Sequence, residues 1–390
     1  MRTLTPDLAA ELADAVYRMV KPRTGQYTFR PSRALEQSFN FNFNSDVIKA
    51  TTGGFLPWLD STTGFALIGH GINQYQGHIA IAIRGTNGLH DTLTDMNFGL
   101  STGPSGTYVH TGFNHAFESM QPALESRLAP RLRAKSAPAV HCVGHSLGGA
   151  LASLTADWLR QKYKHLPYLY TFGAPRVGIE PYARRSTWSN RNIYRCTHGA
   201  DVVTKVPLWP FCHAPVSEPG EYRLDGDRGI SFAAHSMGLT GNPGYRNTAK
   251  GSDWSSLKTA STNFLSQAVR LRYEDRHQAR FTADWADRLG AALVTLLKDA
   301  GYYTMVATQA VIGTALTFYD LLARTLAQLA AASEKLADQA RGLLGHMLVF
   351  AKEAVTTVTN LGYRFIRWVF SRTLSALYRA VQGSLQLAEV

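Results

Sequence analysis

The chain has 390 residues, enough for one large domain with an appendage or for two domains. Hydrophobic residues make up 45% of it and charged residues 17%, which excludes an intrinsically disordered protein. The formal net charge of +12 favours acidic partners such as anionic lipid surfaces, and because no nucleic-acid-binding motif is present we expect no nucleic acid among them. The three cysteines cannot all pair, so no disulfide framework is expected.

The first segment of the chain is predicted to be a helix. Thr5 suits its cap and Pro6 its first turn, and apolar residues then recur on one face until Pro22. Residues 1–8 lack the charged start, long apolar centre and small-residue cleavage site of a signal peptide. We therefore expect synthesis in the cytoplasm, followed by membrane association or by export along a route that uses no signal peptide.

Two β-rich runs follow at residues 65–68 and 78–83, and the second leads into Arg84-Gly85-Thr86. A loop that leaves a strand with threonine at its tip can offer a backbone N–H and a hydroxyl to a developing oxyanion, although an ordinary polar turn has the same pattern. Residues 88–100 place apolar side chains at helical spacing between glycines, as expected either of a mobile flap or of a fixed surface helix.

The segment that organises the chain is Gly144-His145-Ser146-Leu147-Gly148-Gly149-Ala150. It lies between an apolar run at 139–143 that predicts a buried strand and a run at 150–159 that predicts a helix. A strand that turns into a helix within one residue strains that residue, and its neighbours must be small to clear the turn. Gly144 and Gly148 meet this need. The pattern therefore predicts a G-x-S-x-G nucleophile elbow that exposes the Ser146 hydroxyl at the start of a helix.

Further strands are predicted at residues 168–172 and 192–197. With the helix after the elbow they form β-α-β units, so the strands should be parallel. The second strand leads to Asp201, and the carboxyl ends of parallel strands are the edge where ligands bind. Residues 221–224 and 230–232 flank Asp225-Gly226-Asp227 and are predicted to form a hairpin.

Six segments, in this order, resemble the class 3 lipase family, which includes fungal triacylglycerol lipases and bacterial relatives. They cover roughly residues 80–240, and nothing beyond about residue 250 resembles the family. The segments are 83–86, 109–113, 144–150, 171–178, Asp201 with Val206-Pro207, and 235–237. The resemblance implies an α/β fold, namely an α/β-hydrolase domain with a mostly parallel sheet.

The resemblance also implies a role for each site residue. Ser146 corresponds to the nucleophile, Asp201 to the acid and His235 to the base, while Thr86 and the backbone N–H of Leu147 correspond to the oxyanion hole. The chemistry of such a triad requires neither a metal nor a cofactor. Residues 88–100 correspond to the lid, although the family's lid usually carries a tryptophan in its helix and this segment has none.

Other residues also fit parts of this pattern. His213 follows the serine and the acid in chain order, as His235 does, but it lies in a proline-rich loop where a structural role is more common. Asp225 is an alternative acid that we interpret as a turn residue. His145 is next to the nucleophile, and beside an elbow turn its side chain should point into the protein and pack.

Composition changes near residues 245–255, because no proline follows Pro243 and the remainder is rich in alanine, leucine and threonine. This predicts two domains, a lipase-like domain at 1–250 and an all-α region at 251–390.

Residues 300–319 carry no charge, so this run fits either a membrane span or a buried helix of a bundle. From 361 to 381 an apolar arc faces an arc of four arginines, Arg364, Arg367, Arg372 and Arg379, which fits either a helix lying in an anionic lipid interface or a bundle helix with a solvated face.

The sequence thus predicts a serine carboxylic-ester hydrolase acting on lipid esters, either a phospholipase A or a triacylglycerol lipase. Its expected partners are a lipid substrate, a membrane surface and a protein that binds the helical C-terminal region. The membrane-seeking features raise the further hypothesis of a bacterial effector that is delivered into another cell. Two alternatives stay open: a membrane-inserting or partner-binding helical protein with an incidental hydrolase domain, and an esterase or acyltransferase for small soluble acyl groups.

Overall fold

A computed structural model describes most of the chain, and all structural statements below concern its described residues. These are residues 2–19, 29–43, 45–48, 66–85, 99–134, 138–217, 220–227, 229–238, 244–261, 268–309, 315–354, 356–358 and 360–388.

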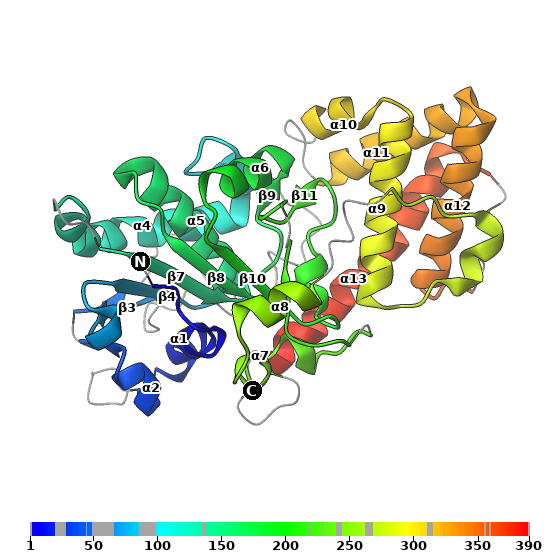
Figure 1. The fold of residues 1–390 in the computed structure, drawn as a ribbon. Coiled ribbons are helices and arrows are strands. Elements are labelled where there is room, and N and C mark those ends of the chain that lie inside the picture. Colours follow the sequence, from blue (N-terminus) through cyan, green and yellow to red (C-terminus); the bar gives the residue numbers. More distant parts are fainter. Residues whose placement is uncertain are drawn as a thin grey trace.

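The main sheet has eight strands within the described ranges (Figure 1). In spatial order they are β1 (Phe39–Asn40), β3 (Ala66–Gly71), β4 (Ile79–Ile83), β7 (Val140–His145), β8 (Tyr168–Phe172), β10 (Ile193–Thr197) and β12 (Tyr222–Arg223), with β2 (Val47–Ile48) paired to β3. Every pairing from β4 to β12 is parallel, whereas β1, β2 and β4 run antiparallel to β3. The predicted mostly parallel sheet is confirmed.

Helices cover both faces of this sheet. Helix α1 (Pro6–Arg18) lies on one face, and α5 (Leu147–Tyr163) with α4 (Thr111–Leu132) lies on the other (Figure 1). Alternate residues of β4 divide between the two layers: Ile79, Ile81 and Ile83 join the core under α4 and α5, and Ala80 and Ala82 join the core under α1. Because side chains of a strand alternate between faces, a strand covered on both sides is apolar throughout. The Thr5 side chain caps α1 as predicted.

The remaining elements of the sheet region are short. A second sheet has the order β11 (Phe211–Cys212), β9 (Gly178–Ile179), β6 (Tyr108–His110) and β5 (Leu100–Thr102). The helices are α2 (Arg33–Glu36), α6 (Glu180–Ser189), α7 (Tyr245–Ala249) and α8 (Trp254–Ala260). The 3-10 turns are η1 (Asn73–Tyr75), η3 (Val202–Lys205) and η4 (Ala233–His235). The hairpin predicted at 221–232 is wrong, because β12 pairs with the distant β10 and residues 230–232 form no strand.

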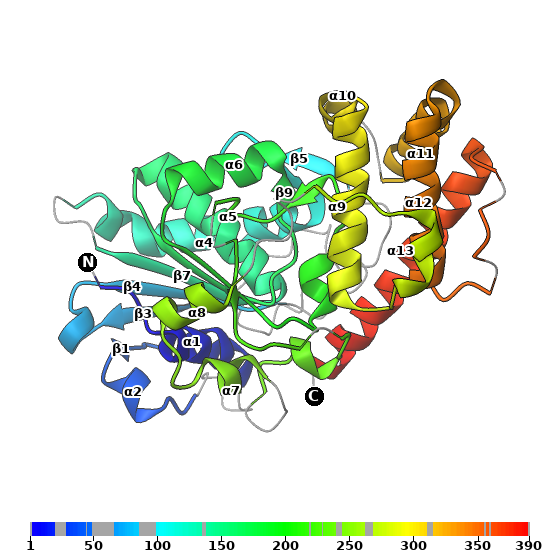
Figure 2. The same cartoon turned by 45° about the vertical axis from the view of Figure 1, so that its right-hand side comes forward.

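The described residues beyond 261 contain helices and no strand, so the predicted all-α region is confirmed. It comprises η6 (Tyr273–Gln278), α9 (Ala283–Asp299), α10 (Tyr303–Gln309), α11 (Ala315–Ala332), α12 (Glu334–Phe350) and α13 (Tyr363–Ala388). These helices lie beside the sheet region, and α13 runs from their far end back toward it (Figures 1 and 2). We refer to residues 268–388 as the helical region.

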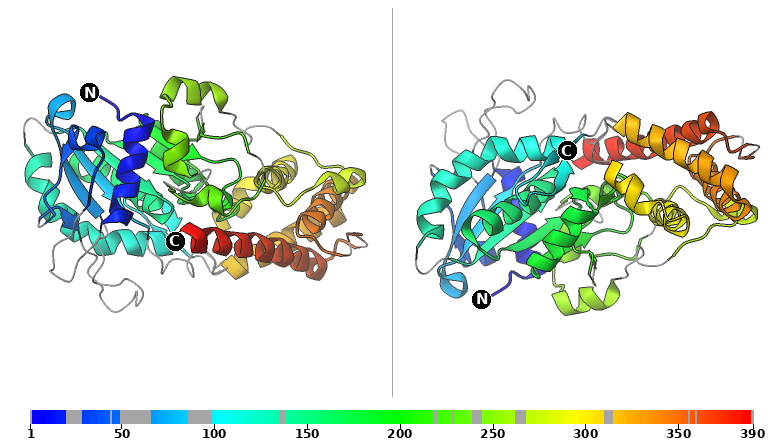
Figure 3. Two further views of the ribbon diagram at one scale, coloured as in Figure 1. Left: turned by 90° about the horizontal axis from the view of Figure 1, so that it is seen from below. Right: turned by 90° about the horizontal axis from the view of Figure 1, so that it is seen from above.

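The helical region shares a hydrophobic core with the sheet region. One cluster of buried residues contains Ile81 and Leu151 of the sheet region together with Leu293, Leu377 and Val381 of the helical region. Helix α13 also packs against η3 and η4, and the two views in Figure 3 show its C-terminal end beside the sheet region. The division at residue 250 stays a prediction about sequence units, since α8 packs on β12 of the sheet.

The amphipathic pattern of α13 is explained by packing within the chain. Its apolar residues Ile366, Val369, Leu377 and Val381 are at most 1% exposed, and the helix contacts α11 and α12. The four arginines of the opposite face are exposed. The structure therefore supports the bundle interpretation of 361–381. Of the uncharged run 300–319, residues 310–314 lie outside the described residues; among the helices that are described, none is long and apolar enough to span a membrane.

Candidate active site

Ser146 stands at the junction between β7 and α5 in a backbone conformation that few residues adopt. Its φ is 55° and its ψ is −130°, and α5 begins at the next residue. A side chain at Gly144 would place its Cβ 2.1 Å from the Gly148 carbonyl oxygen, and one at Gly148 would place it 2.1 Å from the Ile83 carbonyl oxygen. Only glycine fits at either position, so the two glycines allow the strained turn that the G-x-S-x-G pattern predicts.

Three side chains form a continuous hydrogen-bonded relay at this junction. The Nε2 atom of His235 is 2.9 Å from Ser146 Oγ, and its Nδ1 atom is 2.9 Å from Asp201 Oδ2. Ser146 is 6% exposed, and His235 and Asp201 are fully buried. The structure thus brings together the serine, histidine and aspartate that the sequence nominated, from the elbow, from η4 and from the residue that precedes η3.

The carboxylate of Asp201 is held by further donors. Its Oδ1 atom accepts a hydrogen bond from Val203 N–H at 2.9 Å, and its Oδ2 atom accepts one from the Tyr245 hydroxyl at 2.7 Å. Burial raises the pKa of Asp201, but His235, Tyr245 and Val203 together bring that pKa below its ordinary value. The carboxylate is therefore ionised and oriented toward His235.

Tyr245 was not anticipated from the sequence. Its hydroxyl accepts a hydrogen bond from His198 N–H at 3.0 Å and donates one to Asp201, and its ring stacks on that of His198. Burial, followed by the nearby Asp201, raises the pKa of Tyr245 well above its ordinary value, so the hydroxyl stays protonated and acts as a donor. Tyr245 lies in the stretch where the composition changes, and no motif marks it.

The alternative residues have other partners. His213 Nε2 is 2.6 Å from the Thr204 carbonyl oxygen, and burial holds the pKa of His213 well below its ordinary value. Asp225 accepts a hydrogen bond from Gly199 N–H. His145 packs inward as expected: its Nε2 is 2.6 Å from the His235 carbonyl oxygen, and burial lowers the pKa of His145 to about 3. The neutral His145 ring thereby supports the backbone of His235.

Only part of the predicted oxyanion hole is described. Leu147 is the first residue of α5, so its N–H has no carbonyl partner within the helix and lies next to the Ser146 backbone. Thr86 lies outside the described residues, as does most of the predicted lid, since residues 86–98 are not described. Within the described chain no group of histidine, cysteine or carboxylate side chains is arranged to hold a metal ion, and Cys142, Cys196 and Cys212 are free thiols.

A cavity of about 910 Å³ lies between the two regions, separate from the relay. It is lined on the sheet side by Trp188 and Trp209 and on the helical side by Tyr303 and Ala307, and no residue of the relay lines it. The cavity therefore lies apart from Ser146.

Comparison with known proteins finds a family match for the segment that contains Ser146 and Asp201. Residues 80–211 match the family described as Lipase (class 3). The secreted mono- and diacylglycerol lipase 1 of Fusarium solani is 36% identical over 151 residues, which is 38% of this chain and 44% of that protein. Toxin TseL of Vibrio cholerae is 36% identical over 107 residues, which is 27% of this chain and 16% of that protein. The chain therefore spans less than half the length of these relatives. Among solved structures, the lipase of Rhizopus microsporus var. chinensis has 26% identity and a TM-score of 0.41, with 57% of this chain and 73% of that one covered.

Proposed function

We propose that this protein is a serine hydrolase that cleaves carboxylic esters of lipids, because residues 80–211 match the class 3 lipase family. The observation that carries the proposal is the relay of two 2.9 Å contacts from Ser146 through His235 to Asp201, which starts at a strained elbow residue. A serine that only stabilised the fold would need neither the strain nor a buried histidine and carboxylate behind it.

In the proposed mechanism His235 first accepts a proton from Ser146 and then donates it to the leaving alcohol. His235 Nε2 takes the proton of Ser146 as Oγ attacks the ester carbonyl, and the ionised Asp201 stabilises the imidazolium that forms. The Leu147 N–H and the N–H and hydroxyl of Thr86 stabilise the oxyanion. The imidazolium then protonates the leaving alcohol, and water, activated by His235, releases the fatty acid and regenerates Ser146.

We further propose that the substrate is a phospholipid and that the protein works at a membrane surface. Support comes from the net charge of +12 and from the exposed face of α13, where Arg364 and Arg367 line a hollow of about 440 Å³ beside the 40% exposed Trp368. Arginine and tryptophan together suit the boundary between lipid headgroups and acyl chains. Since the apolar face of α13 is buried, this contact would be peripheral and would depend on charge.

The similarity to a protein named as a toxin of Vibrio cholerae supports one finer hypothesis, that this protein is a bacterial effector delivered into another cell. A protein partner of the helical region is a separate proposal.

Fatty-acid release tests the proposal directly. We expect the wild type to hydrolyse vesicles of anionic phospholipid faster than a neutral triacylglycerol emulsion, and Ser146→Ala to hydrolyse neither. Replacing Arg364, Arg367, Arg372 and Arg379 with Gln should weaken vesicle binding about tenfold at low salt and have little effect at high salt. Replacing Arg127 and Arg131 of α4 together with Arg184 and Arg185 of α6 with Gln removes the same charge from exposed positions elsewhere and is the matched control. Faster hydrolysis of the neutral emulsion would reject the phospholipid proposal. If Ser146→Ala hydrolysed small soluble esters as fast as the wild type, the proposal of a hydrolase that uses Ser146 would be rejected.

A further inference from the structure

The turn η3, which follows Asp201 directly, determines where the carboxylate of that residue points. Val203 N–H donates to Asp201 Oδ1 at 2.9 Å, and the Thr204 hydroxyl donates to the Asp201 backbone oxygen at 2.8 Å. Asp201 and all four residues of η3 are at most 3% exposed. Any displacement of η3 would therefore move the Asp201 carboxylate relative to His235.

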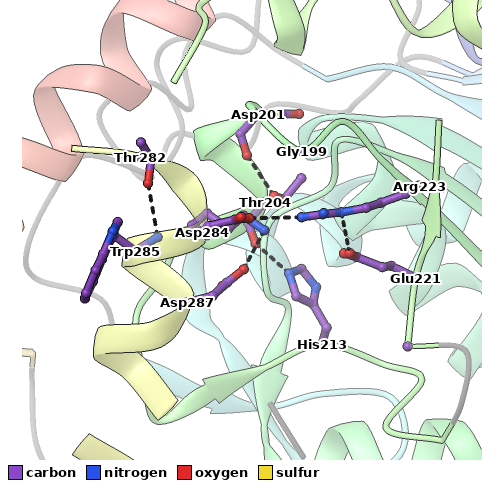
Figure 4. Close-up of polar contacts among 12 residues, drawn as sticks. Gly199, Asp201, Thr204, His213, Glu221, Arg223, Thr282, Asp284, Trp285 and Asp287 are labelled. Carbon is purple, nitrogen blue, oxygen red and sulfur yellow. Dashed lines mark hydrogen bonds and ion pairs between the residues drawn. The ribbon is translucent and has the colours of Figure 1, made fainter. Parts of the chain in front are cut away.

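The far end of this turn is tied to the helical region by one carboxylate. Asp287 of α9 accepts from Lys205 Nζ at 2.8 Å through Oδ2 and from Arg176 at 3.2 Å through Oδ1. Arg176 in turn donates to the carbonyl oxygens of Lys205, at 2.7 Å, and of Pro207, at 3.0 Å. Asp287 is thus the shared anion of two cations that both hold η3. Figure 4 shows Asp287 reaching from α9 toward η3, the turn that carries Thr204 and follows Asp201.

The three charged side chains are buried, so each needs an oppositely charged partner at close range. The side chains of Lys205, Arg176 and Asp287 are 4%, 7% and 12% exposed. A buried charge that loses its partner is costly, and both cations form an ion pair with Asp287. Burial raises the pKa of Asp287, but Lys205 and Arg176 bring that pKa below its ordinary value, so the carboxylate is ionised.

The helical region also contacts the turn that carries the histidine. Helix α13 packs against η4, and the ring of Phe232, which precedes η4, lies close against Gly383 of α13. Helix α9 therefore contacts η3, which follows Asp201, and helix α13 contacts both η3 and η4, which carries His235. This is unexpected for an appendage that only targets the enzyme to a surface.

We propose that Asp287 is a positioning residue of the active site. Through Lys205 and Arg176 it holds η3 so that the Asp201 carboxylate faces His235, and the helical region thereby completes the catalytic site of the sheet region. The inference rests on the proposed hydrolase function. It also predicts that a chain ending near residue 250 is inactive even toward soluble esters, whereas a separate targeting domain could be removed without loss.

The test compares two aspartates of the same helix in the full chain. Asp284 also pairs with an arginine of the sheet region, at 3.2 Å from Arg223, and its side chain is 13% exposed, but Arg223 belongs to β12 and not to η3. With a soluble nitrophenyl ester, Asp287→Asn should lower kcat about 10- to 100-fold and leave KM within about twofold, as misplaced catalytic groups do. Asp284→Asn should keep kcat within about twofold, although its thermal unfolding temperature also falls. Equal kcat losses in the two variants, or an unchanged kcat in Asp287→Asn, would overturn the inference.

A second variant covers the case in which Asp287→Asn does not fold. The double variant Lys205→Met, Asp287→Asn removes one charge of each sign, so it avoids an additional uncompensated cation while still releasing η3. We expect it to fold and to show the same loss of kcat. A folded double variant with the kcat of the wild type would contradict the role of Asp287.

A readout without substrate separates this inference from the proposed function. The proton shared between His235 Nδ1 and Asp201 should give a low-field proton NMR signal in the wild type. That signal should shift or broaden in Asp287→Asn and stay unchanged in Asp284→Asn. If the wild type lacks Ser146-dependent ester hydrolysis, the hydrolase proposal fails, while an altered signal still supports positioning by Asp287 and an unaltered one overturns it.

Discussion

The sheet region and the helical region place their side chains by different means. In the sheet region, backbone geometry positions the side chains. The parallel strands end at one edge of the sheet, and the strained backbone of Ser146, with φ of 55°, sets the direction of its side chain. In the helical region, the packing of apolar faces does it, as the buried face of α13 against α11 and α12 shows. Changes at the sheet edge should therefore abolish catalysis, whereas changes to the apolar contacts of the helical region should lower the stability of both regions.

The largest effect should come from breaking the relay. Ser146→Ala and His235→Ala should each lower kcat by about 10⁴-fold or more, and the double variant should lose little more, because either side chain is ineffective without the other. Steady-state kinetics on a soluble ester measure this. Losses that multiply in the double variant would mean that the two residues act independently and would remove the basis for the triad.

Loss of packing in α13 should have the next largest effect. Leu377 is 1% exposed within the cluster that joins the two regions, so Leu377→Ala should lower the free energy of unfolding by about 2–5 kcal/mol. Since the core is shared, ester hydrolysis and the far-ultraviolet circular dichroism of the whole chain should be lost in one transition along a denaturant series. If the circular dichroism falls in two steps and activity persists through the first step, the two regions unfold independently.

The oxyanion hole should contribute less than the relay. Thr86→Val keeps the backbone N–H and removes the hydroxyl, so kcat should fall by about 10- to 10³-fold with little change in stability. Kinetics and thermal unfolding of the same preparation measure both quantities. An unchanged kcat would show that backbone donors alone stabilise the oxyanion.

The smallest effect concerns the acid stability of the contact between the regions. The pKa of Asp287 lies below its ordinary value of 3.8 in the folded protein, so its contribution to stability is present above that pH and is lost as the pH falls through the folded pKa. Below pH 3.8 the free energy of unfolding of Asp287→Asn should therefore fall less steeply than that of the wild type, by up to about 1.4 kcal/mol per pH unit. Parallel curves from equilibrium unfolding at several pH values would show that Asp287 is not held by its cations.

Much of the sheet region could be predicted from the sequence because its chemistry demands particular residues in a particular order. Gly144, Ser146 and Gly148 predict the elbow by steric necessity, and apolar runs predict β4, β7, β8 and β10. The hairpin at 221–232 was predicted wrongly because β12 pairs with β10, and turn residues do not reveal so distant a partner. Tyr245 and Asp287 were missed since their importance comes from contacts with Asp201 and Lys205 across the fold.

In the helical region, periodicity predicted helices but not their partners. An apolar arc such as that of α13 has the same pattern whether it faces lipid or protein, and only the fold shows that Ile366 and Val381 are buried by neighbouring helices. Residue 250 is a reasonable boundary from proline content alone. Amino-acid composition does not predict the contacts of α9 and α13 with η3 and η4.

The central claim is that Ser146 is a nucleophile activated by His235 and Asp201. Covalent labelling with a fluorophosphonate, followed by mass spectrometry of the peptides, tests it without any assumption about the lipid substrate. The account predicts one adduct per chain on Ser146, formed rapidly in the wild type, at least about a thousandfold more slowly in His235→Ala, and absent in Ser146→Ala. An adduct on another residue, or labelling of Ser146 at the same rate without His235, would contradict it.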